Sequence, residues 1–252
     1  MQQAYRALRI IAEAQTIRIV LAPDPAELML NELYTACASL HTESSSGIKA
    51  VVLDFHADAT QSTSGAINRG ATINRGATIN RAPTIGEKGQ GAINRAPTMA
   101  EKASAAVRAI AQPVLAVVSA TLSKPACMLI QAADFTLVAE DAVLVVLNRE
   151  TGEEDTLTGA QAARLRYVTW SAPANDISKQ RERILDLLRA KSAIALRHAK
   201  ASIHLAEAGQ ATRLEALQQV NTLYLTLVMQ THDAHEGLHA FLEKRKPNWK
   251  NK

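Results

Sequence analysis

The stretch that decides the fold runs from Pro113 to Ala139 and reads PVLAVVSATLSKPACMLIQAADFTLVA. It opens with the apolar run 113–119 and closes with a second one, 135–139, and short apolar runs of this kind are typical of buried strands. Between them, Pro125 suits the first turn of a helix, where no backbone N–H is required. The stretch therefore predicts a strand, a turn, a helix and a second strand.

The residues around this stretch continue the alternation of strands and helices. Further apolar runs predict strands at 17–21, 50–55 and 142–147. A helix is expected between Pro23 and Leu40, with Asp24 as its N-cap and Pro25 at its first position. Alternating helices and buried strands indicate a mixed α/β fold.

Helical periodicity dominates the later part of the chain. The segment from Met99 to Ile110 has a capping box, because Thr98 is followed three residues later by Glu101. From 177 to 243 the sequence is nearly all helical, with breaks expected near Gly209 and Gly237. We therefore expect an α/β core over residues 1–176 and a helical oligomerisation region over residues 177–252.

A repeat interrupts the core between Gly65 and Thr98. The unit Gly-Ala-(Thr)-Ile-Asn-Arg recurs four times, and no acidic residue occurs between Gly65 and Gly86. A period of about six residues is too short for a helical solenoid. The composition favours a low-complexity, solvent-exposed insertion. The alternative is a basic lid over an anionic ligand.

Composition excludes several classes of protein. The chain has 252 residues, with 47% hydrophobic and 21% charged residues, and a net charge of +4. Charges of both signs alternate, which argues against nucleic-acid binding. No apolar run is long enough for a membrane span, and no signal peptide is recognised, so a cytoplasmic location is expected. Cys37 and Cys127 lie in apolar stretches and are expected to be buried free thiols.

The segment 232–245, HDAHEGLHAFLEKR, is the most specific motif in the chain. Together with KSAIALRHAKASI at 191–203, KAVVLD at 49–54 and AAD at 132–134, it resembles the crotonase superfamily of enoyl-CoA hydratases and isomerases. The C-terminal motif is particularly similar to that of cyclic dienoyl-CoA hydratases. His232, His235 and His239 also have the spacing of a zinc site, but the resemblance explains the motif without a metal, and no metal is expected.

This resemblance implies a spiral of ββα units followed by a helical trimerisation region. It also implies a homotrimer or a dimer of trimers that acts on a coenzyme A thioester without a separate cofactor. In the family, residues matching Phe241 and Lys244 approach the CoA bound by a neighbouring subunit. Both residues are therefore candidates for substrate contact.

Crotonase chemistry requires two N–H donors for the thioester oxygen. The resemblance places the first donor at Ser64. The second falls on Pro125, which has no N–H, so a shift of one residue to Ala126 is needed to supply it. Ser64 and Ala126 are therefore the candidate oxyanion donors.

The family also uses two carboxylates to move protons. Their positions here are occupied by Met128 and Asn148, which leaves Glu150 and His56 as candidate proton carriers. His56 is also two residues from Asp58, with which it has the spacing of a possible dyad. Two functions follow from the resemblance. One is acyl-CoA chemistry of the hydratase or isomerase type, and the other is a non-catalytic binding or assembly subunit.

Overall fold

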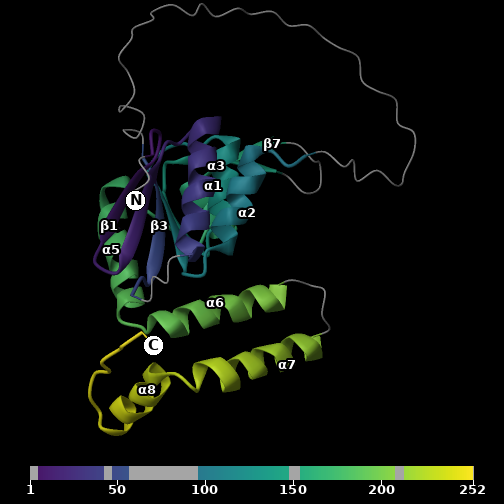
Figure 1. Cartoon of the computed structure of the whole chain (residues 1–252). Coiled ribbons are helices and arrows are strands. Elements are labelled where there is room, and N and C mark those ends of the chain that lie inside the picture. The colour runs from purple at the N-terminus through teal and green to yellow at the C-terminus, as the bar shows by residue number, and fades with distance from the viewer. Residues whose placement is uncertain (1–4, 43–46, 57–95, 148–153, 208–212, 252) are drawn as a thin grey trace, which may run out of the picture.

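A six-stranded sheet organises the first part of the chain in the computed structural model, which describes residues 5–42, 47–56, 96–147, 154–207 and 213–251 (Figure 1). The spatial order is β1-β2-β3-β4-β5-β8. β1 pairs with β2 in antiparallel fashion, and every other neighbouring pair in this sheet is parallel. The strands are β1 (Arg9–Glu13), β2 (Thr16–Leu21), β3 (Ala50–Phe55), β4 (Val114–Val118), β5 (Phe135–Ala139) and β8 (Trp170–Ala172).

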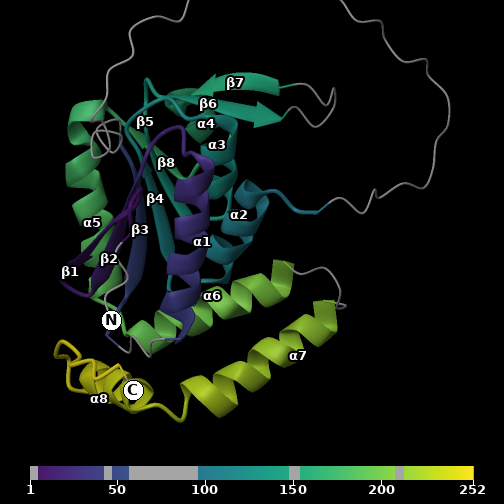
Figure 2. The ribbon, with the colours of Figure 1, turned by 45° about the horizontal axis from the view of Figure 1, so that its top comes forward.

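Helices cover both faces of this sheet, which explains why β3 and β4 are almost entirely apolar. On one face lie α1 (Glu27–Thr42), α2 (Met99–Ala109) and α3 (Lys124–Gln131), and on the other lies α5 (Ile177–Arg189) (Figure 2). Every residue of β4 is buried. The apolar runs predicted as buried strands therefore form the centre of the sheet.

Local capping rules set the start of two of these helices. The predicted capping box is confirmed, because Thr98 Oγ1 accepts from the Glu101 amide at 3.3 Å and Glu101 Oε2 accepts from the Thr98 amide at 2.8 Å. The predicted N-cap at Asp24 is wrong, since α1 begins at Glu27.

A two-stranded hairpin, β6 (Val143–Leu147) with β7 (Glu154–Thr158), lies beside the main sheet and leads into α4 (Gly159–Arg164). A side chain is excluded at Gly159, because a Cβ there would lie 2.0 Å from the Ala139 carbonyl oxygen. The start of α4 is thereby packed directly against the end of β5.

The C-terminal helices form a layer at the end of the sheet where the parallel strands begin (Figures 1 and 2). Beyond α5, this layer contains α6 (Ala193–Glu207), α7 (Arg213–Leu223), the π-helical turn η3 (Tyr224–Val228) and α8 (His232–Leu242). The ammonium of Lys200 on α6 bonds Asp134 Oδ2 at 2.8 Å and the Gln112 carbonyl at 3.1 Å. The expected break at Gly237 is wrong, since this residue lies inside α8, where Trp249 packs over it.

The N-terminal segment is held by one carboxylate, and this contact predicts a pH effect. Glu32 accepts hydrogen bonds from the amides of Arg6, Ala7 and Leu8 at 2.8, 2.8 and 3.0 Å. Desolvation alone would raise the pKa of Glu32, but the three amides outweigh it and lower the pKa below 4.5.

The lowered pKa means that Glu32 stabilises the fold above about pH 4.5 and loses this effect as the pH falls through its folded pKa. We expect Glu32→Gln to unfold at lower urea concentration than the wild type at pH 7. The difference between the two proteins should shrink as the pH falls through the folded pKa of Glu32, as measured by urea titration across pH. A constant difference between them at all pH values would contradict this assignment.

Candidate functional site

The ends of β3 and β4 bring together two polar side chains that are 63 positions apart in the sequence. Each strand is extended by one residue, because the His56 amide bonds the Leu21 carbonyl at 3.0 Å and the Ser119 amide bonds the Phe55 carbonyl at 3.3 Å. His56 Nδ1 lies 3.1 Å from Ser119 Oγ. This strand-end pair lies at the end of the sheet away from α6 (Figure 2).

The hydrogen bonds around Ser119 fix the tautomer of neutral His56. Ser119 Oγ also lies 3.1 Å from the Phe55 carbonyl oxygen, which can only accept, so the hydroxyl proton points there. Ser119 Oγ must then accept from His56, which places the imidazole proton on Nδ1. In this tautomer the lone pair of the exposed ring is on Nε2. A neutral imidazole has the chemistry of a general base.

The turn after β4 leads directly into the N-terminus of α3, which lacks a side-chain cap. Ser123 is the N-cap residue, yet its hydroxyl accepts no capping hydrogen bond, and Pro125 follows in the first turn, as predicted. Ala126 is fully buried, and its amide has no acceptor among the described residues. A buried first-turn amide without an acceptor is an unused hydrogen-bond donor.

The structure describes some of the predicted catalytic residues and not others. Ala126 lies in the first turn of α3, which follows β4, and His56 lies directly after β3. Ser64 and Glu150 lie outside the described residues, as does Asp58, so their predicted roles stay predictions. Most of the repeat, residues 57–95, lies outside them as well. Ser119 was missed, because a serine at the end of an apolar run gives no sequence signal.

Phe241 lies in α8 and Lys244 directly after it, and this helix is at the other end of the molecule (Figure 1). The Phe241 side chain is 80% exposed, although it is one of the largest apolar residues of the chain. Lys244 follows the helix with a φ of 54°, in the left-handed region common at helix C-termini. Within one chain, these two residues are not brought to the strand-end pair.

Asp233 acts as a buried anchor for the C-terminal tail. It is 3% exposed and accepts from the Ser192 hydroxyl, from the Lys250 amide at 2.8 Å and from the Asn251 amide at 3.0 Å. The tail also caps α6, because Asn251 Oδ1 accepts from the Ala193 amide at 3.0 Å. The role of Asp233 is therefore to join the tail, α6 and α8.

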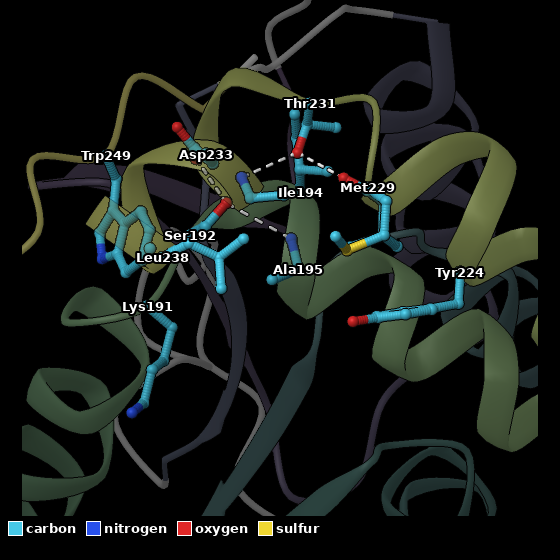
Figure 3. Close-up of a pocket in the computed structure, with 13 residues that line it drawn as sticks. Lys191, Ser192, Ile194, Ala195, Tyr224, Met229, Thr231, Asp233, Leu238 and Trp249 are labelled. Carbon is cyan, nitrogen blue, oxygen red and sulfur yellow. Dashed lines mark hydrogen bonds between the residues drawn. The ribbon is translucent and has the colours of Figure 1, made fainter. Parts of the chain in front are cut away.

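An apolar cavity of about 380 Å³ lies beside this anchor (Figure 3). Its walls come from α6, η3, α8 and the tail, and include Ile194, Met229, Leu238 and Trp249. The Trp249 indole is fixed by a hydrogen bond from Nε1 to the Ala190 carbonyl at 2.8 Å. Asp233, the acidic group at the edge of the cavity, already accepts hydrogen bonds from three donors. The cavity wall is therefore mainly apolar and has no available carboxylate for a ligand among the residues that line it.

The cysteines and the histidines of the C-terminal motif are the remaining candidates from the sequence. Cys37 and Cys127 are buried free thiols, as predicted, and burial raises the pKa of Cys37 to about 12. In the part of the chain that the structure describes, no three His, Cys, Asp or Glu side chains converge on a metal site. His232, His235 and His239 all lie in this part. No described helix is long and apolar enough to cross a membrane.

No family model matches the chain, and one curated protein matches a short part of it. Cyclohexa-1,5-dienecarbonyl-CoA hydratase of Thauera aromatica is 55% identical over 38 residues. The match spans 15% of this chain and 15% of that relative.

Solved structures match over nearly the whole chain. An enoyl-CoA hydratase from Bacillus anthracis superposes with a TM-score of 0.70 at 18% identity, covering 98% of this chain and 100% of that one. An enoyl-CoA hydratase/isomerase from Mycobacterium paratuberculosis gives 0.67 at 18%, covering 99% and 100%. A hydratase from Mycobacterium smegmatis gives 0.66 at 17%, covering 96% and 98%. The chain therefore has the crotonase fold, the α/β spiral with a helical C-terminal region that these structures share.

Proposed function

We propose that this protein binds an acyl-CoA thioester and catalyses a reaction of the enoyl-CoA hydratase or isomerase type. The observation that supports this most directly is the buried first-turn amide of Ala126, which has no acceptor among the described residues, in a fold shared with enoyl-CoA hydratases. The short match to a dienoyl-CoA hydratase suggests that a conjugated cyclic acyl group is also a candidate substrate.

In this proposal the chain's own groups divide the work. The Ala126 amide donates to the thioester oxygen, and the amide of Ser64 is the second donor. One such donor is worth about 3 kcal/mol in the transition state. His56 Nε2 moves the proton, which contributes roughly 100- to 10,000-fold in rate, and Glu150 is the alternative carrier.

The assembly is part of the same proposal. The outer helices expose several large apolar side chains among the described residues, namely Leu217, Tyr224, Leu225, Leu227, Leu238, Phe241 and Leu242. Large exposed apolar side chains concentrated on neighbouring helices are typical of a surface that another protein chain covers. We infer a homotrimer, or a dimer of trimers, in which Phe241 and Lys244 of one copy contact the CoA held by the next.

A second candidate function is a non-catalytic binding or assembly subunit. It is favoured by Met128, which occupies a half-buried position on α3 where the family has a carboxylate, and by Pro125, which lacks an N–H. Calorimetric titration of the full chain with CoA and a short enoyl-CoA separates the two functions when the enoyl absorbance is followed on the same sample. Binding with loss of that absorbance supports catalysis, binding alone supports the second function, and no binding refutes both ligand proposals.

Ser119 is expected to act by positioning His56. Ser119→Ala removes one hydrogen bond, worth about 0.5–1.5 kcal/mol, so we expect kcat to fall roughly two- to tenfold with little change in KM. Ser119→Thr keeps a hydroxyl and should restore most of the rate. The ¹⁵N shifts of the His56 ring should report the Nδ1–H tautomer in the wild type and a mixture in Ser119→Ala. Identical ring shifts in both proteins would contradict this role.

A further inference from the structure

A second cavity, of about 620 Å³, lies between the end of α2 and the inner face of α6, at the end of the sheet where the parallel strands begin. β4 separates it from the strand-end pair, and five strand residues span roughly 16 Å. The described residues that line it include five basic side chains and no acidic one. These five are Arg108, Arg197, His198, Lys200 and His204.

The basic side chains of this cavity are only partly neutralised. Asp134 lies behind the wall and pairs with Lys200 at 2.8 Å and, more distantly, with His204 Nε2 at 3.6 Å. Arg108 is in the last turn of α2, where a cation offsets the helix dipole. For Arg197 and His198, which are both half-buried, the described residues provide no hydrogen-bond acceptor and no carboxylate partner. Positive charge therefore remains in the cavity.

The pKa values of two cavity residues are lowered, as expected for burial and for cations that lie together without enough negative charge. Burial lowers the pKa of His198, and the neighbouring Arg197 lowers it further. Burial also lowers the pKa of Lys200, with Asp134 opposing and Arg108 adding to the decrease. A bound anion would relieve the repulsion between these cations.

We propose that this cavity binds a small organic phosphate. Guanidinium groups match phosphate oxygens with paired donors, and imidazole and ammonium groups add single ones. The apolar part of the wall, from Ile110, Ile194 and Leu227, suits the carbon portion of such a ligand. A cavity of this size is within the range of small-molecule sites and larger than inorganic phosphate needs. The site is separate from the proposed thioester site.

The test uses the full chain and two probes, phenyl phosphate and inorganic pyrophosphate, each titrated by calorimetry. We expect both to bind and the Arg197→Gln variant to bind at least about tenfold more weakly, because a charge-assisted pair is lost. Arg164→Gln is the matched control, since Arg164 is exposed on α4 and does not line the cavity. In the wild type, NMR titration should show the pKa of His198 rising when phenyl phosphate is bound.

Three results would overturn the proposal. These are no binding of either probe, equal binding by Arg197→Gln and the wild type, and an unchanged His198 titration with phenyl phosphate bound. Competition by CoA identifies the source of the phosphate. If CoA displaces phenyl phosphate and Arg197→Gln weakens both, the cavity takes a phosphate group of CoA. If CoA does not displace it, the site serves a different phosphate ester.

Discussion

His56→Asn is expected to lower kcat for the enoyl-CoA reaction by roughly 100- to 10,000-fold, with KM nearly unchanged. Asparagine has about the reach of the imidazole, and its Nδ2 can still donate to Ser119 Oγ, but it cannot take up a proton at neutral pH. The measurement is steady-state loss of enoyl absorbance with wild-type and variant proteins at the same concentration.

The matched control is His235→Asn. His235 is also an exposed histidine, but it lies on α8, away from the strand-end pair (Figure 1). Its replacement should leave kcat unchanged. A His56→Asn variant with wild-type activity would remove His56 from the reaction and leave Glu150 as the candidate proton carrier. An inactive wild type that still binds CoA would favour the non-catalytic function.

Asp134→Ala is expected to lower the free energy of unfolding by about 3 kcal/mol, or roughly 6–12 °C in Tm. The Asp134 carboxylate accepts from the Val114 amide at 2.7 Å and pairs with Lys200, whose side chain is only 6% exposed. Its removal leaves a buried ammonium with the Gln112 carbonyl as its remaining described acceptor. Thermal unfolding followed by circular dichroism measures the effect.

A double variant tests the cause of this loss. Lys200→Met removes the buried charge, so Asp134→Ala with Lys200→Met should recover most of the stability lost in the single Asp134→Ala variant. If the double variant is as unstable as the sum of the two single ones, the loss comes from the Val114 amide and from packing instead. The ion pair would then contribute little to docking α6 on the sheet.

The centre of the fold was predictable because its signals are local. Continuous apolar runs predicted β2, β3, β4, β5 and β6, and the capping box at Thr98 predicted the start of α2. In contrast, β1 and β7 were missed. β1 is a largely exposed edge strand, and β7 is polar, so neither has the apolar pattern of a buried strand.

The candidate site was only partly predictable. The resemblance led to Ala126 and left His56 as a proton carrier. The structure places Ala126 in the first turn of α3 and His56 directly after β3. The partner of His56 is Ser119. A serine at the end of an apolar run has no sequence signal that would indicate this contact. The basic cavity was not predicted either, because its cations come from α2 and α6, which are far apart in the sequence.

By itself, the sequence determined the α/β class, the buried central strands, the helical C-terminal region and the crotonase resemblance. Apolar periodicity, proline placement and capping residues act within a few positions, so they can be read from the chain directly. Only the tertiary structure decided which polar groups meet. The His56–Ser119 contact, the Lys200–Asp134 pair and the Asp233 anchor each join segments that are 40 or more positions apart. Such contacts depend on sheet order and helix docking, which no local pattern encodes.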